Sequence, residues 1–143
     1  MNTAPYLRKA QFYETDQMGI IHHANYIRWM EEARTDFMEQ VGYPYEKASQ
    51  AGIDFAVVSV QCEYKSPVRF GDTVAIYAGL QQLTPSRMTV QYTIQDAQSA
   101  AIRLFGTSQH CYFDGNRQRP VSLLKALPEL YEIFSRYLIF EKQ

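Results

Sequence analysis

The sequence is poor in cysteine, and its positive and negative charges nearly cancel. Its two cysteines, Cys62 and Cys111, fall in separate strand-like segments without CxxC spacing, which argues against a zinc or redox motif. Both are expected to be buried, reduced thiols. The formal net charge of −1 gives no overall positive field to attract phosphate backbones, so we expect no nucleic-acid partner.

Long apolar runs are also missing. No segment approaches the ~18 consecutive apolar residues of a transmembrane helix, so we expect no membrane span. The first twelve residues, MNTAPYLRKAQF, lack the apolar core of a secretory signal, which favours a cytoplasmic location. At ~150 residues per domain, a chain of 143 residues predicts a single domain over 1–143.

One amphipathic helix is predicted over residues 24–41. Apolar residues recur there at three- and four-residue steps, as one buried helical face requires. Gly42 followed by Pro44 predicts the end of this helix, and residues 44–51 are expected to add a short helical turn closed at Gly52. The apolar positions are Tyr26, Ile27, Met30, Ala33, Phe37, Met38 and Val41.

The remaining periodic segments predict strands. A short strand is expected over 5–13, and after Gly52 the apolar residues alternate with polar ones over 53–66, 74–80, 88–94 and 101–113. Consecutive long strands joined by short turns form an antiparallel meander. The apolar stripe of the helix is the large surface available to cover one face of this sheet, so the predicted fold class is α+β.

The C-terminal part, residues 121–143, is predicted to be a helical extension of the domain. Its apolar pattern is interrupted at Pro128, and we expect a helix to begin near that residue. The aromatic tail over 137–140, Tyr-Leu-Ile-Phe, is too apolar for free solvent. We expect it to dock on a neighbouring subunit.

The segment with the most chemical information is YETDQMGIIHHANYIRWMEEAR, residues 13–34, which joins the first strand to the helix. Asp16 precedes Gly19, a residue that can adopt the positive φ of a tight reversal. The helix that follows offers unpaired N–H groups and a partial positive charge. Such donors can polarise a carbonyl while a carboxylate attacks it or activates water. From the residues alone, Asp16 also fits an Asx turn or a helix cap.

This segment resembles the signature of the hotdog-fold, 4-hydroxybenzoyl-CoA-thioesterase-like family of acyl-CoA thioesterases. The resemblance implies a hotdog fold, in which an antiparallel sheet wraps around a long central helix, and it covers almost the whole chain. Tyr64-Lys65-Ser66-Pro67 before Phe70-Gly71-Asp72 agrees with it. The matching positions are Tyr13, Thr15, Asp16, Gly19, Ile20, Ile21, His22, His23, Asn25 and Tyr26, followed by Glu32-Ala33-Arg34.

The resemblance implies a hydrolase that converts an acyl-CoA to a carboxylate and free CoA. Asp16 stands at the position of the family's catalytic carboxylate, a nucleophile or general base. The backbone amide of His23 stands where the family polarises the thioester carbonyl. Gly19, His22 and Tyr26 are assigned to substrate binding. A residue such as Tyr26 on the apolar face of a helix is more often part of the core than of a pocket lining, and His22 stands where the family often has Tyr.

Basic residues are candidates for contacts with the CoA phosphates. Arg69 and Arg87 are assigned to substrate binding on this ground, and Lys65 and Arg103 are further candidates. Each of them taken singly also fits a solvated surface charge. The family often has Lys or Arg followed by Ser where this chain has Arg87 followed by Met88, so the match is incomplete there.

Several other site chemistries do not fit. His22 and His23 are adjacent in an extended loop and lack further ligands at a suitable spacing, so we expect no metal site. No tightly held cofactor is implied. A serine hydrolase is excluded because the sequence has no GxSxG and no alternating order of strands and helices. Asn25 is predicted to cap the helix, with a bond to the preceding loop as the alternative.

The resemblance also implies partners. Hotdog sheets pair edge to edge into dimers and commonly stack as tetramers, with the active site at the dimer interface, so we expect a homo-oligomer. A hotdog hydratase is disfavoured because the sequence lacks the Asp-His pair of the hydratase motif. A non-catalytic acyl-CoA or acyl-carrier binding module, and a thioesterase acting on acyl carrier protein, remain as alternatives.

Overall fold

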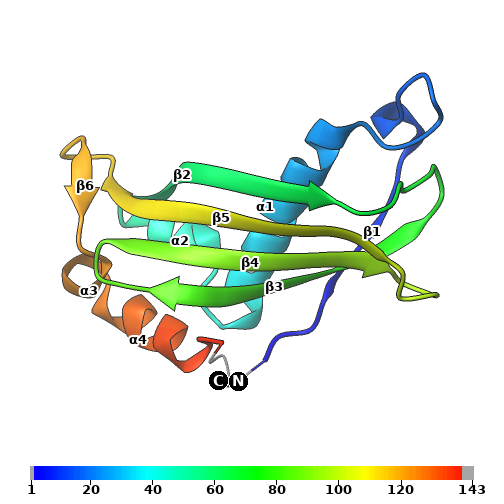
Figure 1. Cartoon of the computed structure of the whole chain (residues 1–143). Coiled ribbons are helices and arrows are strands. Elements are labelled where there is room, and N and C mark those ends of the chain that lie inside the picture. Colours follow the sequence, from blue (N-terminus) through cyan, green and yellow to red (C-terminus); the bar gives the residue numbers. More distant parts are fainter. Residues whose placement is uncertain (1, 140–143) are drawn as a thin grey trace.

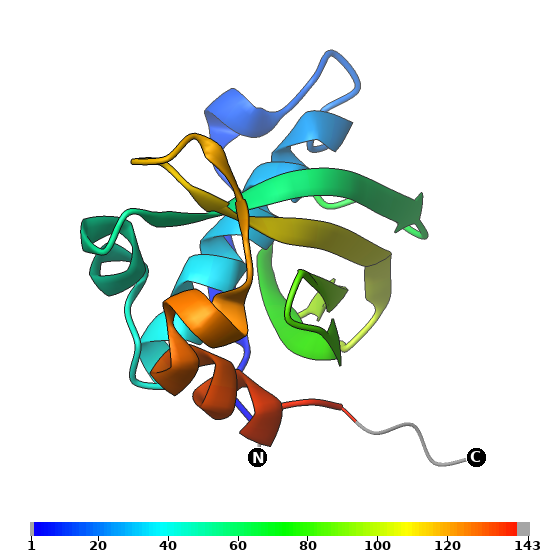
Figure 2. The same cartoon turned by 90° about the vertical axis from the view of Figure 1, so that its left-hand side faces the viewer.

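A computed structural model describes residues 2–139. In this part of the chain six strands form one sheet with the order β1-β3-β4-β5-β2, and the sixth strand, β6, pairs with β5. Figure 1 shows the long strands side by side, and Figure 2 shows that the sheet curves around α1. The strands are β1 (Tyr6–Lys9), β2 (Ile53–Tyr64), β3 (Thr73–Leu83), β4 (Arg87–Asp96), β5 (Ile102–Asp114) and β6 (Arg119–Val121).

Helix α1 (His23–Gln40) covers the inner face of the sheet. It differs from the predicted helix by one residue at each end. The chain continues through α2 (Tyr45–Gln50), and after β6 it forms α3 (Leu123–Ala126) and α4 (Pro128–Arg136). Among residues 2–139, none of the helices combines the length and apolar character needed to cross a membrane.

The predicted meander is confirmed for β3, β4 and β5, which pair antiparallel in chain order. Strand β2 pairs with β5 and therefore ends the order on its side of the sheet. Its register shifts between Val57 and Ser59, where a bulge interrupts the ladder. The α+β class predicted from the periodicities is confirmed.

The core lies between α1 and the inner face of the sheet. Trp29 and Met30 of α1 are fully buried there, against alternate residues of the strands. Two buried residues of this face are polar, Ser108 and His110 of β5. The largest buried strand residues are Tyr92, Tyr112, Ile76, Leu80, Ile94 and Leu104.

The first strand is shorter than predicted. It ends at Lys9, and the chain then turns into a 3-10 helix, η1 (Phe12–Glu14). The Glu14 carboxylate accepts the backbone N–H of Gln11 at 2.8 Å and thereby draws the chain away from β3. A buried side-chain interaction has overridden the strand pattern at this point.

The C-terminal tail packs on its own chain. The N–H of Ile139 donates to the Leu80 carbonyl of β3 at 2.8 Å, and the Tyr137 ring contacts the Phe37 ring at a centroid distance of 5.9 Å. Residues 137–139 therefore pack along the edge of β3, which is open beyond its pairing with β1, and docking of the tail on a neighbouring subunit stays a prediction. Phe140 lies outside the described residues.

Candidate active site

A closed loop carries Asp16 to the start of α1. Thr15 and Ile21 form an antiparallel bridge across its base, and Ile20 bridges to Arg69. Inside the loop the Asp16 N–H donates to the Ile20 carbonyl at 2.8 Å, and its carbonyl accepts the Gly19 N–H at 3.1 Å. Gly19 has φ +78°, as the predicted reversal requires.

The two oxygens of the half-buried Asp16 carboxylate differ in their partners. Oδ1 accepts the backbone N–H of Met18 at 2.8 Å, which forms an Asx turn. Oδ2 has no hydrogen-bond partner within residues 2–139. The Asx turn therefore orients the side chain and leaves one oxygen without a partner in the described chain.

The first turn of α1 presents an unpaired donor beside this loop. His22 is the N-cap, and its Nδ1 accepts the N–H of Ala24 at 3.2 Å. The next residue, His23, begins the helix, and its N–H finds no acceptor in the described chain, as expected for a first helical residue. The two imidazole rings stack at a centroid distance of 4.2 Å.

Asn25 has a different role from the predicted one. It lies inside α1, is buried, and donates through Nδ2 to the Glu14 carbonyl at 2.9 Å. The N–H of His22 donates to the same carbonyl at 2.9 Å. The prediction that Asn25 caps the helix is wrong, since its alternative role of bonding the loop is the one observed. The helix start and the Asp16 loop are joined at this carbonyl.

Tyr26 lies beneath the helix start and is only 4% exposed. Its hydroxyl accepts the Val68 N–H at 3.3 Å, and its ring contacts Tyr64 at 5.5 Å. Burial raises the pKa of Tyr26, and the negative charge of Asp16 acts in the same direction. Tyr64, at the end of β2, donates to the His23 carbonyl at 3.2 Å. Tyr26 therefore supports the wall of the site from below.

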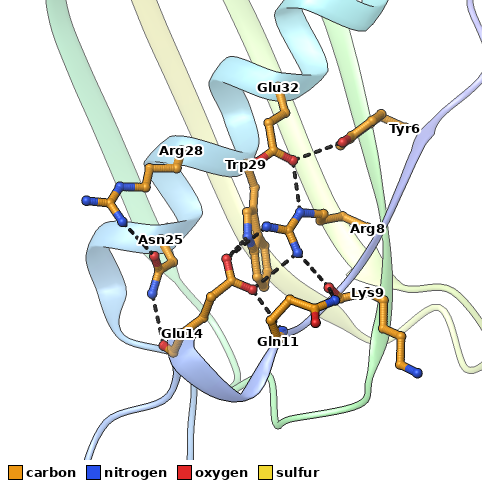
Figure 3. Close-up of polar contacts among 9 residues, drawn as sticks. All are labelled: Tyr6, Arg8, Lys9, Gln11, Glu14, Asn25, Arg28, Trp29 and Glu32. Atoms are coloured by element: carbon orange, nitrogen blue, oxygen red, sulfur yellow. Dashed lines mark hydrogen bonds and ion pairs between the residues drawn. The ribbon is translucent and has the colours of Figure 1, made fainter.

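A buried carboxylate that the sequence did not reveal lies two residues before Asp16. Glu14 is 3% exposed, and Figure 3 shows it between Arg8 and Trp29. Its Oε2 accepts Trp29 Nε1 at 2.9 Å and Arg8 Nη2 at 3.0 Å, while Oε1 accepts the Gln11 N–H and Arg8 Nη1. Four donors occupy this carboxylate, so it ties β1, η1 and α1 together.

The same cluster extends to Glu32 of α1. Arg8 Nε and the Tyr6 hydroxyl both donate to Glu32 Oε1 at 2.9 Å (Figure 3). The Arg8 guanidinium also lies 5.5 Å from the centroid of the Trp29 ring. No spacing rule connects these positions along the sequence, which is why pattern reasoning missed the cluster.

The basic residues predicted to contact the CoA phosphates lie in different parts of the structure. Arg69 is exposed and adjoins the Asp16 loop through its bridge to Ile20, and no carboxylate of residues 2–139 forms an ion pair with it. Lys65 pairs with Glu63, and Arg103 pairs with Asp96. Arg87 begins β4, at the far end of a strand about 30 Å long at ~3.3 Å per residue. In this chain Arg87 does not join the other site residues.

Within residues 2–139, no three or more His, Cys, Asp or Glu side chains gather as a metal site would require. Both cysteines are free and half-buried rather than fully buried. Burial raises the pKa of the Cys62 thiol, whose Sγ lies 3.9 Å from Met30 Sδ. The cysteines therefore behave as packing residues.

Comparison with protein families matches residues 10–131 to the thioesterase-like superfamily. The chain belongs to this superfamily. The match spans the Asp16 loop, α1 and strands β2 to β6. As a member, the protein is a thioesterase, which confirms the enzyme class predicted from the sequence.

Similar proteins support this membership. A candidate esterase of Aquifex aeolicus is 36% identical over 106 residues, covering 74% of this chain and 81% of that protein. YneP of Bacillus subtilis, named as a candidate acyl-CoA thioesterase, is 28% identical over 128 residues, covering 90% and 92%. A DHNA-CoA thioesterase structure from Staphylococcus aureus superimposes with a TM-score of 0.89 at 24% identity, covering 93% and 89%. This superposition confirms the hotdog fold.

Proposed function

We propose that this thioesterase hydrolyses acyl-CoA to a carboxylate and free CoA, with Asp16 as general base or nucleophile. One observation carries the proposal. The loop–helix unit holds a carboxylate oxygen and a helix N-terminal amide, on Asp16 and His23, both without partners in the described chain. Acyl transfer to water needs these two groups together.

In the general-base route, Asp16 Oδ2 takes a proton from the water that attacks the thioester carbon. The His23 N–H donates to the carbonyl oxygen as it becomes an oxyanion. The C–S bond then breaks, and the proton held by Asp16 passes to the CoA sulfur. In the nucleophilic route Asp16 attacks the carbon itself, and the C–S bond breaks as the CoA thiolate leaves. Water then hydrolyses the resulting anhydride to the free carboxylate and regenerates the Asp16 carboxylate, and a proton released in this step passes to the CoA thiolate.

CoA as the carrier is supported by the similarity to YneP and by the exposed Arg69 beside the loop, a cation suited to a phosphate. Gly19 and His22 border the same loop and are the proposed substrate contacts, with Tyr26 supporting them from below. Arg87 could reach a substrate only at the site of a second copy. A thioesterase for acyl carrier protein is the remaining alternative for the carrier.

Pairing with a second copy is supported by the free edge of β2, the last strand in the sheet order. Unpaired strand edges attract another strand, and pairing through β2 would extend the sheet into a dimer. Whether dimers stack into a tetramer, and the cytoplasmic location, stay predictions from the sequence resemblance.

The proposed function is tested by hydrolysis of a panel of acetyl-, benzoyl-, decanoyl- and palmitoyl-CoA with thiol release as the readout. We expect the wild type to turn over at least one thioester and Asp16→Asn to lose at least about 10²-fold in kcat, as for loss of a general base. Asp36→Asn, a change on α1 that leaves the loop intact, is the matched control and is expected to retain wild-type kcat.

Two outcomes would contradict the proposal. Equal kcat values for Asp16→Asn and the wild type would remove Asp16 from the mechanism. Binding of acyl-CoA by both proteins without thiol release would instead identify a non-catalytic binding module.

A further inference from the structure

A cavity lies between α1 and the inner face of the sheet. Its volume is about 350 Å³, within the ~300–1,000 Å³ typical of small-molecule sites. Two of its lining residues, Ile27 and Val57, are exposed. Its walls are mostly apolar and include Phe55, Val60, Val90 and Phe134.

Arg34 of α1 brings a positive charge to this apolar cavity. Its Nη1 donates at 3.1 Å to the hydroxyl of Tyr92, which is fully buried on β4, so the guanidinium points inward beneath the helix. No carboxylate of residues 2–139 forms an ion pair with Arg34, although Glu31 also lines the cavity. A guanidinium has five N–H donors, and Tyr92 accepts only one of them.

The groups behind Tyr92 add no negative charge. Its hydroxyl lies 2.7 Å from Ser108 Oγ, which lies 2.7 Å from Nε2 of His110. Arg34 can only donate, so the Tyr92 hydroxyl accepts from it. Tyr92 then donates its own O–H to Ser108 Oγ, and Ser108 donates to the neutral imidazole of His110. Nδ1 of His110 is buried without a partner in the described chain. The charge of Arg34 is therefore left without a counter-ion.

The cavity lies along α1 from the candidate active site, because its lining residue Ile27 follows His23 by four residues, about one helical turn. Strand β2 runs beside α1 in the opposite sense, since Tyr64 contacts His23 and Cys62 contacts Met30 further along. Arg34 follows His23 by eleven residues, about 16 Å along the axis at ~1.5 Å per residue. Helical side chains point back toward the N-terminus and shorten this span. An extended chain of about ten carbon atoms, whose bonds of ~1.5 Å each advance it by somewhat less than their length, covers a span of this order.

We propose that this cavity receives the acyl chain of the thioester substrate, and that Arg34 selects medium-length chains whose far end carries an oxygen acceptor, a carboxylate or a hydroxyl. This assignment rests on the proposed function, because it requires the thioester carbonyl to lie at Asp16 and His23. A carboxylate suits the uncompensated guanidinium best, since charge-assisted pairs between these groups are the stronger hydrogen bonds.

The test measures binding in the Asp16→Asn background, where turnover does not consume the ligand. Calorimetry compares decanoyl-CoA, 10-hydroxydecanoyl-CoA and the mono-CoA thioester of decanedioic acid. We expect the two oxygen-terminated thioesters to bind about 10- to 100-fold more tightly than decanoyl-CoA, the range for a hydrogen bond to a charged group. Adding Arg34→Met is expected to abolish this preference, while Arg34→Lys retains part of it.

Arg117→Met, which removes a largely exposed arginine from the turn after β5, is the matched control and should keep the full preference. Equal affinity for the three thioesters before Arg34 is changed, or equal weakening of all three by Arg34→Met, would overturn the assignment. So would failure of all three to bind. Loss of the preference in Arg34→Met together with no thiol release by the wild type would instead refute hydrolysis and leave the binding assignment standing.

Discussion

Glu14 and Asp16 are two residues apart, and their carboxylates have opposite surroundings. Four donors occupy the buried Glu14 carboxylate, whereas one oxygen of Asp16 stays unpaired within residues 2–139. Because four donors occupy the oxygens of Glu14, its carboxylate is used to hold neighbouring elements together. This contrast supports a positioning role for Glu14 and the proposed catalytic role of Asp16.

Replacing Glu14 with Gln tests this division at the residue scale. Glutamine is uncharged and has an N–H₂ group in place of one carboxylate oxygen, so it meets the donors around Glu14 with a donor of its own. The buried ion pair with Arg8 and one further hydrogen bond are therefore lost. We expect the free energy of unfolding to fall by about 3 kcal/mol, the lower range for breaking a buried pair. We also expect kcat to fall with KM nearly unchanged, because the Asp16 loop loses its anchor. Urea unfolding and steady-state hydrolysis measure the two effects.

Glu63→Gln is the control, because Glu63 is 69% exposed in its pair with Lys65. An exposed pair contributes little to stability. A Glu14→Gln protein as stable and as active as Glu63→Gln would show that the buried cluster has no positioning role.

At the scale of elements, the loop before α1 carries the candidate site, and the outer edge of β2 is the proposed surface for a second copy. Gly19 reverses the loop with positive φ, and His22 caps the helix, so the positions of Asp16 and His23 follow from one short segment. The edge of β2 is a different feature, because its backbone groups face away from β5 without a strand partner in residues 2–139. Val57 and Val58 are 54% and 44% exposed there.

Val57→Lys tests whether this edge joins two copies. Lysine on an edge strand disfavours strand pairing because it places a charge in the interface. We expect sedimentation velocity to show that the wild type is a dimer or larger and that Val57→Lys shifts it toward the 16.6 kDa monomer. Leu124→Lys changes an apolar residue of α3 that is 46% exposed, and it should leave the assembly intact. A wild type that is monomeric at micromolar concentration would contradict this prediction.

At the scale of the whole molecule, stability should depend on pH through His110. Burial, with a smaller contribution from the charge of Arg34, lowers the pKa of His110 from 6.5 to about 4. Between these values the unfolded chain binds a proton that the folded protein does not. The free energy of unfolding should therefore keep its full value above pH ~6.5 and fall by at most about 3 kcal/mol as the pH drops to ~4.

Urea unfolding at several pH values measures this effect. His110→Asn should flatten the pH dependence in that interval. His22→Asn, which keeps an acceptor at the N-cap of α1, should retain it. An unchanged pH profile in His110→Asn would contradict the prediction.

Much of the fold followed from local pattern. The three-to-four-residue period predicted α1, the two-residue period predicted the long strands, and Pro128 marked the start of α4. Errors came where the contacts of a buried polar side chain overrode the local pattern. Glu14 shortened the first strand, and Asn25 served the loop rather than the helix cap. The position of β2 beside β5 was also beyond pattern reasoning, because pairing depends on the whole sheet.

The sequence by itself determined the long strands, the loop with Asp16 and Gly19, and the central helix to within one residue of its start, since these depend on residues within a few positions of one another. Only the tertiary structure decided which side chains became buried partners. The Arg8–Glu14–Trp29 cluster, and Arg34 with Tyr92 and Ser108, join residues from separate elements. Their hydrogen bonds form because folding removes these groups from water and leaves them only one another as partners.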